Sequence, residues 1–297
     1  MRVIITGGAG FVGSHLAGSL LSDGNEVGIV DNLHTGSLGN VPEGARFLEA
    51  DAKEISRIGI APETIFHLGI YSSSPMYRDD RSLVAKAIDS TIGVLEHARR
   101  CECPVVVASS SSVYNGNPTP YSEDMPLKVT DFYTEARIAV ERLGELYSVM
   151  YGFPVASLRF FSIYGPGEES KGQFANPVSQ FIWSARKSER PVIYGDGQQT
   201  RDFVHVDDVL DALLRTPGKG GIYNVGTGKS HTMNDIVRII GKCMDVNLEP
   251  VYCPVPYNNY VHDTLADARR ATRELGFRAK IQPEEGIRRL VNKRMVA

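Results

Sequence analysis

Short apolar runs alternate with longer segments of mixed apolar and polar residues along roughly the first 160 positions of the chain. The run at 105–108 is apolar throughout, which is typical of a strand buried on both faces of a parallel sheet. Strands are predicted at 3–6, 26–30, 46–49, 64–68, 105–109 and 155–160, and helices at 12–22, 83–100 and 132–150. This strand–helix–strand order predicts an α/β fold with a Rossmann doubly wound parallel sheet.

The first predicted strand runs into a glycine-rich segment, residues 6–13, that fits G-x-x-G-x-x-G from Gly7 and G-x-G-x-x-G from Gly8. Glycines let the backbone turn tightly and approach a pyrophosphate, and the following helix offers free N–H groups. The second strand ends at Asp31, whose carboxylate suits adenosine ribose hydroxyls and repels a 2′-phosphate. Positions 32–37 hold no Lys or Arg, so NAD is favoured over NADP. The alternative is a glycine-rich turn beside a surface aspartate.

The composition limits the expected binding partners more than it limits the expected fold. The 297 residues carry 32 basic and 35 acidic side chains, so we expect no nucleic-acid partner and no anionic membrane surface. No apolar run reaches the roughly 18 to 20 residues of a membrane span, and no signal-peptide pattern follows Met1, so we expect a cytoplasmic protein. Cys101 and Cys103 have no His or Cys partners at zinc spacing, so we expect no metal site.

Further motifs follow in a fixed order along the chain. They are His67-Leu68, four serines before Val113-Tyr114, Tyr133 with a base four residues on, and the segment Leu-Arg-Phe-Phe-x-x-Tyr-Gly-Pro-Gly at 158–167. With the glycine segment they resemble the extended short-chain dehydrogenase/reductases. The stretch 194–208 resembles the branch of NAD-dependent nucleotide-sugar epimerases and dehydratases, in particular the UDP-glucose (UDP-galactose) 4-epimerases. The resemblance covers nearly the whole chain.

A tyrosine hydroxyl is a weak base at neutral pH, so it needs a cation nearby and a serine hydroxyl to hold the reacting oxygen. The resemblance implies that Tyr133 is the acid/base, that Ser110 is the catalytic serine, with Ser111 as a substitute, and that Arg137 is the cation. The four serines could also be only a polar strand end. Arg137 stands where the family has lysine, with a larger, planar head group. From the sequence we expect an Arg137→Lys variant to retain or raise activity.

The resemblance also implies ligand contacts. The cofactor-binding residues are expected to be Gly7, Gly10, Phe11, Val12, Asp31, Asn32, Thr35, Gly36, Asp51, Ala52, Leu68, Gly69, Ile70, Tyr133, Arg137 and Phe160. The substrate-binding residues are expected to be Ser110, Ser111, Tyr133, Ser162, Asn176, Tyr194 and Arg201. Among these, the planar fork of Arg201 is expected to grip a diphosphate. Ser162 replaces a common asparagine, and residues 257–263 replace a phosphate-binding Arg-x-Gly-Asp.

The residues around the serines favour one reaction of the family. Dehydratases and decarboxylases commonly carry a carboxylate where this chain has Ser111 and Ser112. The resemblance therefore implies 4-epimerisation of a nucleotide-diphosphate sugar, with UDP-glucose, UDP-galactose or a UDP-N-acetylhexosamine as substrate. Tyr133 would take the 4-hydroxyl proton while NAD accepts the C4 hydride. Two alternatives stay open: a sugar-nucleotide dehydrogenase or reductase that releases NADH, and a binding protein whose catalysis has decayed.

Domains and assembly complete the expectations. We predict an NAD-binding Rossmann domain over 1–163, to which part of 200–226 returns, and a nucleotide-sugar-binding lobe formed by 164–199 and 227–297. The helices near 83–100 and 132–150 carry apolar residues on more than one face. Because relatives pair such helices across a two-fold axis, we expect a homodimer. The alternative is that the sheet buries these helices fully.

Overall fold

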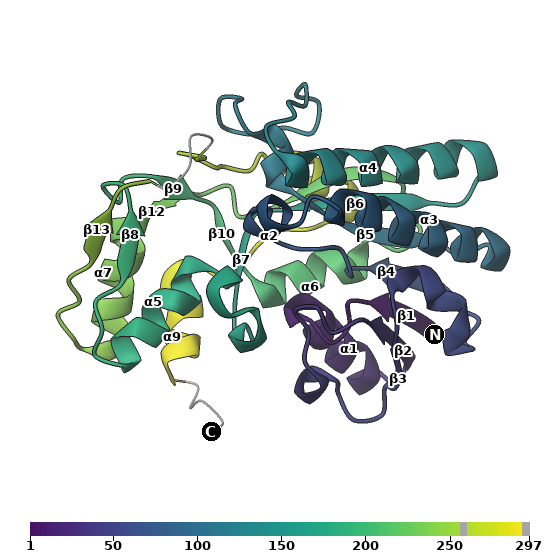
Figure 1. The fold of residues 1–297 in the computed structure, drawn as a ribbon, viewed down its shortest axis with the longest axis horizontal. Coiled ribbons are helices and arrows are strands. Elements are labelled where there is room, and N and C mark those ends of the chain that lie inside the picture. The colour runs from purple at the N-terminus through teal and green to yellow at the C-terminus, as the bar shows by residue number, and fades with distance from the viewer. Residues whose placement is uncertain (256–259, 293–297) are drawn as a thin grey trace. The chain divides into compact units, whose positions relative to one another are not determined.

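The computed structural model describes residues 1–255 and 260–292, and Figure 1 shows its ribbon. Contacts divide the chain into two compact units. Unit 1 comprises Met1–Asn115, Pro126–Arg159 and Leu210–Tyr223, and unit 2 comprises Gly116–Met125, Phe160–Val209 and Asn224–Ala297. These bounds differ from the expected domains at 116–125 and 160–163, which group with unit 2, whereas the returning segment, 210–223, lies within the expected range 200–226.

Unit 1 is built on a seven-stranded sheet in the order β11-β6-β5-β4-β1-β2-β3. The strands are β1 (Arg2–Thr6), β2 (Glu26–Asp31), β3 (Arg46–Glu49), β4 (Thr64–His67), β5 (Val105–Ser110), β6 (Val155–Phe160) and β11 (Gly221–Val225). The pairs β1–β2, β2–β3, β1–β4 and β4–β5 are parallel. The chain moves outward from β1 to β3 and then returns to β4 on the other side of β1, so the strand order reverses there. The predicted Rossmann fold is confirmed.

Local sequence explains the elements of unit 1. Strands β1 to β6 and helices α1 (Phe11–Ser22), α3 (Leu83–Cys101) and α4 (Phe132–Tyr151) each begin and end within one residue of their predicted positions. Every residue of β5 and β6 is buried, as their apolar runs predict. The Asp131 side chain caps α4 by accepting a bond from Thr134 N, and the helix ends at Gly152 in the left-handed conformation. Figure 1 shows α3 and α4 side by side along the sheet.

Shorter helices complete this part of the chain. They are α2 (Ser74–Asp79), α6 (Val206–Arg215), and the 3₁₀ turns η1 (Leu38–Asn40), η2 (Ala52–Ile58) and η3 (Ser111–Tyr114). The turn η3 follows β5 directly, so Ser110 ends the strand and Ser111 begins the turn. None of the helices in the described part of the chain is long and apolar enough to cross a membrane.

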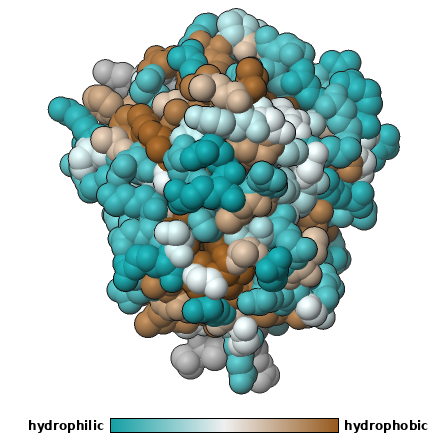
Figure 2. All heavy atoms as spheres, turned by 90° about the vertical axis from the view of Figure 1, so that its right-hand side faces the viewer, coloured by the Kyte–Doolittle hydropathy of each residue, from teal (hydrophilic) through white to brown (hydrophobic). Residues whose placement is uncertain are grey.

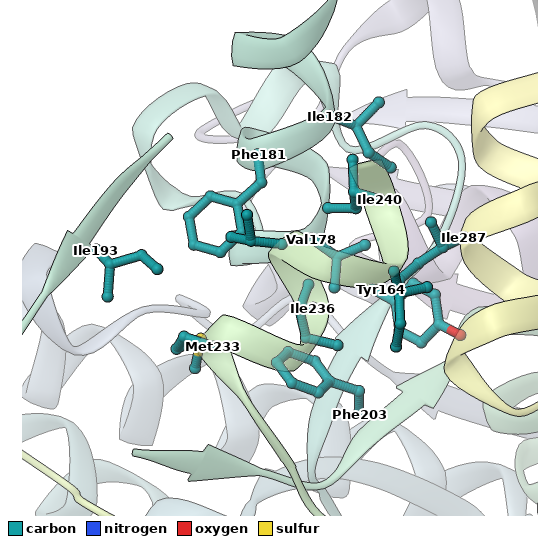
Figure 3. Close-up of a cluster of buried hydrophobic side chains, with 12 residues drawn as sticks. Tyr164, Val178, Phe181, Ile182, Ile193, Phe203, Met233, Ile236, Ile240 and Ile287 are labelled. Carbon is teal, nitrogen blue, oxygen red and sulfur yellow. The ribbon is translucent and has the colours of Figure 1, made fainter. Parts of the chain in front are cut away.

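Unit 2 consists of helices and short strand pairs. Its strands pair as β7 (Ser162–Tyr164) with β10 (Phe203–His205), β8 (Val192–Tyr194) with β13 (Val251–Cys253), and β9 (Thr200–Arg201) with β12 (His231–Thr232). Its helices are η4 (Glu169–Phe174), α5 (Pro177–Arg186), α7 (Met233–Met244), α8 (Arg269–Leu275) and α9 (Pro283–Asn292). Figure 3 shows apolar side chains of α5, α7 and α9 converging with those of β7, β8 and β10, among them Phe181, Ile236 and Ile287. This cluster is the core of unit 2.

Candidate active site

The glycine turn after β1 is shaped by contacts that leave no room for side chains. Gly7 has φ +73°, its N–H donates to Val30 O (2.9 Å), and Gly10 N–H donates to Gly7 O (3.1 Å). A Cβ at Gly13 would lie 2.1 Å from Gly7 O, so an alanine there would displace the turn. Helix α1 starts after Gly10 with no acidic residue and no side-chain cap in its first turn. The amides of that turn therefore fit a pyrophosphate.

Asp31 lies at the end of β2 and is tied to the same turn. One carboxylate oxygen accepts the N–H of Ala9 (2.9 Å), and the other accepts the N–H of Leu33 (2.8 Å). Burial raises the pKa of Asp31, and the two backbone bonds lower it in part. These bonds fix the orientation of the carboxylate while leaving lone pairs for a ligand. The arrangement fits the adenosine ribose of NAD, as the sequence predicts.

The other expected cofactor residues follow the carboxyl ends of neighbouring strands. Asn32, Thr35 and Gly36 follow β2, Asp51 and Ala52 follow β3, Leu68, Gly69 and Ile70 follow β4, and Phe160 ends β6. Carboxyl ends of parallel strands meet at one edge of a sheet, where ligands of such folds bind. The Gly69 N–H donates to Thr6 Oγ1 (3.2 Å), which joins the segment after β4 to the end of β1.

Tyr133 lies in the first turn of α4 and is almost fully buried. Its ring packs edge-on against Tyr77, with ring centroids 5.4 Å apart, and Arg137 Cζ lies 4.9 Å from its ring centroid. Because Arg137 follows Tyr133 by four residues, the helix places both side chains on one face. Ser110 ends β5, and its Oγ accepts the N–H of Ser112 (3.2 Å). The structure thus places a permanent positive charge beside the tyrosine that is expected to act as acid/base.

The guanidinium of Arg137 is held by backbone carbonyls. Nη1 donates to Ala108 O (2.7 Å), and Nη2 donates to Tyr71 O (2.7 Å) and Ile70 O (3.3 Å). The residue is 3% exposed, and no described residue accepts a hydrogen bond from its Nε. The planar fork therefore connects α4 to β5 and to the segment after β4. A lysine has one terminal nitrogen in place of the two that reach these carbonyls from different sides, which distinguishes arginine from lysine at this position.

His67 is the last residue of β4. Its Nδ1 pairs with Thr6 Oγ1 (2.7 Å) and its Nε2 with Thr91 Oγ1 (3.1 Å). Burial, with a smaller contribution from the charge of Arg137, lowers the pKa of His67 to about 3. The imidazole is therefore neutral at physiological pH, and its two bonds give it a structural role between β1, β4 and α3.

Three of the expected substrate residues of unit 2 are Asn176, Ser162 and Tyr194. Asn176 caps α5 by accepting the N–H of Val178 (3.0 Å), and its Nδ2 donates to Ser162 Oγ (3.0 Å) and to Ile163 O (2.8 Å). The structure thus brings Asn176 and Ser162 together. Tyr194, at the end of β8, is half exposed, and its carbonyl accepts a bond from Gln199 Nε2 (2.6 Å).

Arg201 is the fourth expected substrate residue of unit 2. Carbonyl groups of the segment that replaces Arg-x-Gly-Asp accept its hydrogen bonds. Its Nη1 donates to Thr200 O (2.8 Å) and His262 O (2.9 Å), and its Nη2 donates to Val261 O (2.6 Å). The guanidinium also lies 5.5 Å from the Tyr260 ring. Residues 257–259 of the replaced motif lie outside the described residues. The described part of the segment supplies carbonyl acceptors for Arg201.

Two buried charged residues that contact the neighbours of Ser110 were not found from the sequence. Glu141 lies two turns beyond Tyr133 on α4, and Arg159 lies in β6. Both are buried and paired with each other (2.6 Å). The available signal was an arginine inside the mostly apolar run 155–161, because a charge in a buried strand needs a partner.

The parallel sheet, the glycine turn with Asp31 and the Ser110, Tyr133 and Arg137 side chains define a dinucleotide-dependent enzyme of the extended short-chain dehydrogenase/reductase class. The family model described as "NAD dependent epimerase/dehydratase family" matches residues 3–226. The chain belongs to this family. The family is NAD dependent, and the glycine turn and Asp31 fit that cofactor.

Individual relatives are similar over nearly their whole length. The UDP-glucose 4-epimerase of Mycolicibacterium smegmatis is 32% identical over 307 residues, which cover 98% of this chain and 97% of that protein. The crystal structure of Thermotoga maritima UDP-glucose 4-epimerase with UDP-glucose has a TM-score of 0.93 at 30% identity, covering 98% and 97%. That of Thermus thermophilus UDP-glucose 4-epimerase with NAD has a TM-score of 0.89 at 30% identity, covering 98% of each chain. Other relatives are named UDP-sugar decarboxylases.

Proposed function

We propose that this chain is an NAD-dependent UDP-sugar 4-epimerase that interconverts UDP-glucose and UDP-galactose or the corresponding UDP-N-acetylhexosamines. The observation that carries the proposal is Tyr133, buried against Tyr77 with the charge of Arg137 4.9 Å from its ring centroid. Decarboxylation is less well supported, because Ser111 and Ser112 provide no carboxylate beside Ser110. The similarity to UDP-glucose 4-epimerases over 98% of the chain agrees with this choice.

The chemistry follows from the side chains. Tyr133 takes the proton of the sugar 4-hydroxyl and later returns it to the 4-keto oxygen. Arg137 holds a positive charge beside the Tyr133 ring, and Ser110 Oγ donates a hydrogen bond to the reacting oxygen. NAD, when bound by the first turn of α1 and by Asp31, supplies a reversible hydride acceptor. The hydride would return to the opposite face of C4, so the configuration at C4 would invert and the reaction would leave no net NADH.

Unit 2 would bind the nucleotide diphosphate. Arg201 supplies a positive charge for the diphosphate, and the Asn176 and Ser162 pair supplies neutral polar groups for phosphate or uridine oxygens. Tyr194 presents a half-exposed ring for the base. We test these assignments through the KM for the UDP-sugar, which should rise in Arg201→Gln while kcat changes less.

The decisive experiment is incubation with UDP-glucose or UDP-galactose, with and without added NAD, followed by separation of the sugars. Interconversion without NADH accumulation is the expected result, and Tyr133→Phe should abolish it while NAD affinity is kept. Steady accumulation of NADH with an oxidised sugar would identify a dehydrogenase instead. NAD binding without turnover across a panel of UDP-sugars would identify a binding protein.

We also propose a homodimer through α3 and α4. Among the apolar residues of α4, Ile138 and Val140 are buried, but Leu146, Val149 and Met150 are 50%, 79% and 60% exposed. The sheet therefore does not bury α4 fully. Figure 2 shows that apolar spheres lie among polar ones on the face that it draws. A second copy of the same helix face would cover these side chains across a two-fold axis.

A further inference from the structure

A buried ion pair joins α4 to the next-to-last residue of β6. Arg159 Nε donates to Glu141 Oε1 (2.8 Å), and Arg159 Nη2 donates to Glu141 Oε2 (2.6 Å). Glu141 is 4% exposed and Arg159 is 1% exposed. Desolvation of two such charges often exceeds their attraction, so apolar residues of similar volume would stabilise the same position at least as well. The pair therefore calls for an explanation other than packing.

Two further bonds of the pair lead to the two sides of Ser110. Ser109 Oγ donates to Glu141 Oε1, and Ser109 directly precedes Ser110 in β5. Arg159 Nη1 donates to the Tyr114 hydroxyl (2.7 Å), and its Cζ lies 4.7 Å from the Tyr114 ring centroid. Tyr114 ends the turn η3 that begins at Ser111. The pair thus holds the strand residue before Ser110 and the far end of the turn after it.

On α4 the same pair continues the row of catalytic side chains. Tyr133, Arg137 and Glu141 are spaced by four residues and lie on one helix face. Arg137 binds the carbonyl of Ala108, and Glu141 binds the hydroxyl of the next residue, Ser109. Two successive turns of α4 are therefore fixed to two successive residues of β5, directly before Ser110. A change at Arg137 or at Glu141 would therefore alter the position of Tyr133 relative to Ser110.

We propose that Glu141 and Arg159 are positioning residues that set the geometry between Tyr133 and Ser110, beyond any contribution to folding. This inference rests on the proposed roles of those two residues in proton transfer. A purely structural pair predicts that any replacement that restores stability restores activity. A positioning pair predicts that stability and turnover separate, because an apolar replacement packs the space without binding Ser109 or Tyr114.

The test compares Glu141→Gln, the double variant Glu141→Leu with Arg159→Met, and the matched control Glu145→Gln, which changes an exposed glutamate one turn further along α4. Turnover is measured with UDP-galactose and with its C4-deuterated form, beside thermal unfolding and NAD binding. We expect Glu141→Gln and the folded double variant to lose about 10- to 100-fold in kcat with KM and NAD affinity within about twofold. The deuterium effect on kcat should increase, because hydride transfer becomes limiting. Glu145→Gln should match the wild type.

Several outcomes overturn the proposal. A folded double variant with wild-type kcat would show that the ion pair is only structural. If the double variant does not fold, Glu141→Gln decides: an unchanged kcat and isotope effect in a folded Glu141→Gln protein would overturn the inference. If the wild type does not interconvert the sugars, or if Tyr133→Phe keeps full activity, the proposed function fails and the inference fails with it. Failure of the inference alone leaves wild-type turnover and the Tyr133→Phe defect intact.

Discussion

Replacing Arg137 by lysine separates the charge of this residue from its hydrogen-bonding fork. The ammonium of a lysine keeps a positive charge near Tyr133, but it lacks the two terminal nitrogens that reach Ala108 O and Tyr71 O, each at 2.7 Å. We expect lysine to keep one of these bonds and to leave the other carbonyl without its partner. A hydrogen bond from a charged group contributes about 1.5–3 kcal/mol, so unfolding free energy should fall by about that amount.

The assay is urea unfolding followed by circular dichroism, with turnover measured on the same samples. Arg142→Lys is the control, because Arg142 is an exposed residue of the same helix and should change stability by less than about 0.5 kcal/mol. The sequence alone favours an Arg137→Lys variant with retained or higher activity. The carbonyl bonds reverse that expectation: kcat should fall, though less than in Tyr133→Phe, because the charge stays. Unchanged stability in Arg137→Lys would refute the role assigned to the fork.

Three further predictions concern the cofactor turn, a buried histidine and assembly. Gly13→Ala should abolish NAD binding, because the new Cβ would lie 2.1 Å from a backbone oxygen. Gly18→Ala is the control and should keep NAD binding, because a Cβ there would have nothing within 4 Å. Equal NAD affinities of the two variants, measured by calorimetry, would contradict this prediction. Because the pKa of His67 is about 3 when folded and 6.5 when free, the unfolded state binds more protons between these values. The unfolding free energy should therefore fall by up to about 1.4 kcal/mol per pH unit as the pH drops through this range. Urea unfolding at a series of pH values measures this slope as the difference in unfolding free energy between the wild type and His67→Asn. Replacing Leu146 and Val149 by lysine should give a monomer in light scattering, and an unchanged mass would exclude the proposed interface.

The fold of unit 1 is predictable because most residues of its inner strands, such as β1, β4, β5 and β6, are buried. Such strands appear in the sequence as uninterrupted apolar runs, and the amphipathic helices between them have a clear period. The strands of unit 2 have two or three residues each, for example β9 and β12, and a segment this short has no period to detect. Their pairing depends on contacts between segments that lie far apart in the chain.

The candidate site shows the same distinction between local and distant contacts. The glycine turn, Asp31 and Tyr133 are recognisable by residue type and spacing along one stretch of chain. The acceptors of Arg137 lie 29, 66 and 67 residues away, and the partner of Glu141, a residue of helix α4, lies in strand β6. The sequence predicts a positive charge at Arg137. It does not predict that backbone carbonyl groups accept the hydrogen bonds of the Arg137 guanidinium. Arg201 repeats the case, since its acceptors at 261 and 262 belong to a segment that differs from the family motif.

The sheet order has a consequence for how the chain can be divided. Strand β6 lies between β5 and β11, and β11 is contributed by residues 221–225, about 60 residues after β6 ends. A fragment that stops near residue 160 would therefore expose the backbone of β6, whose six residues are all buried, as an open apolar edge. We expect such a fragment to aggregate during synthesis. On the ribosome, too, this sheet stays incomplete until residues 160–209 of unit 2 and then β11 have been made, so unit 1 cannot be completed before part of unit 2 exists.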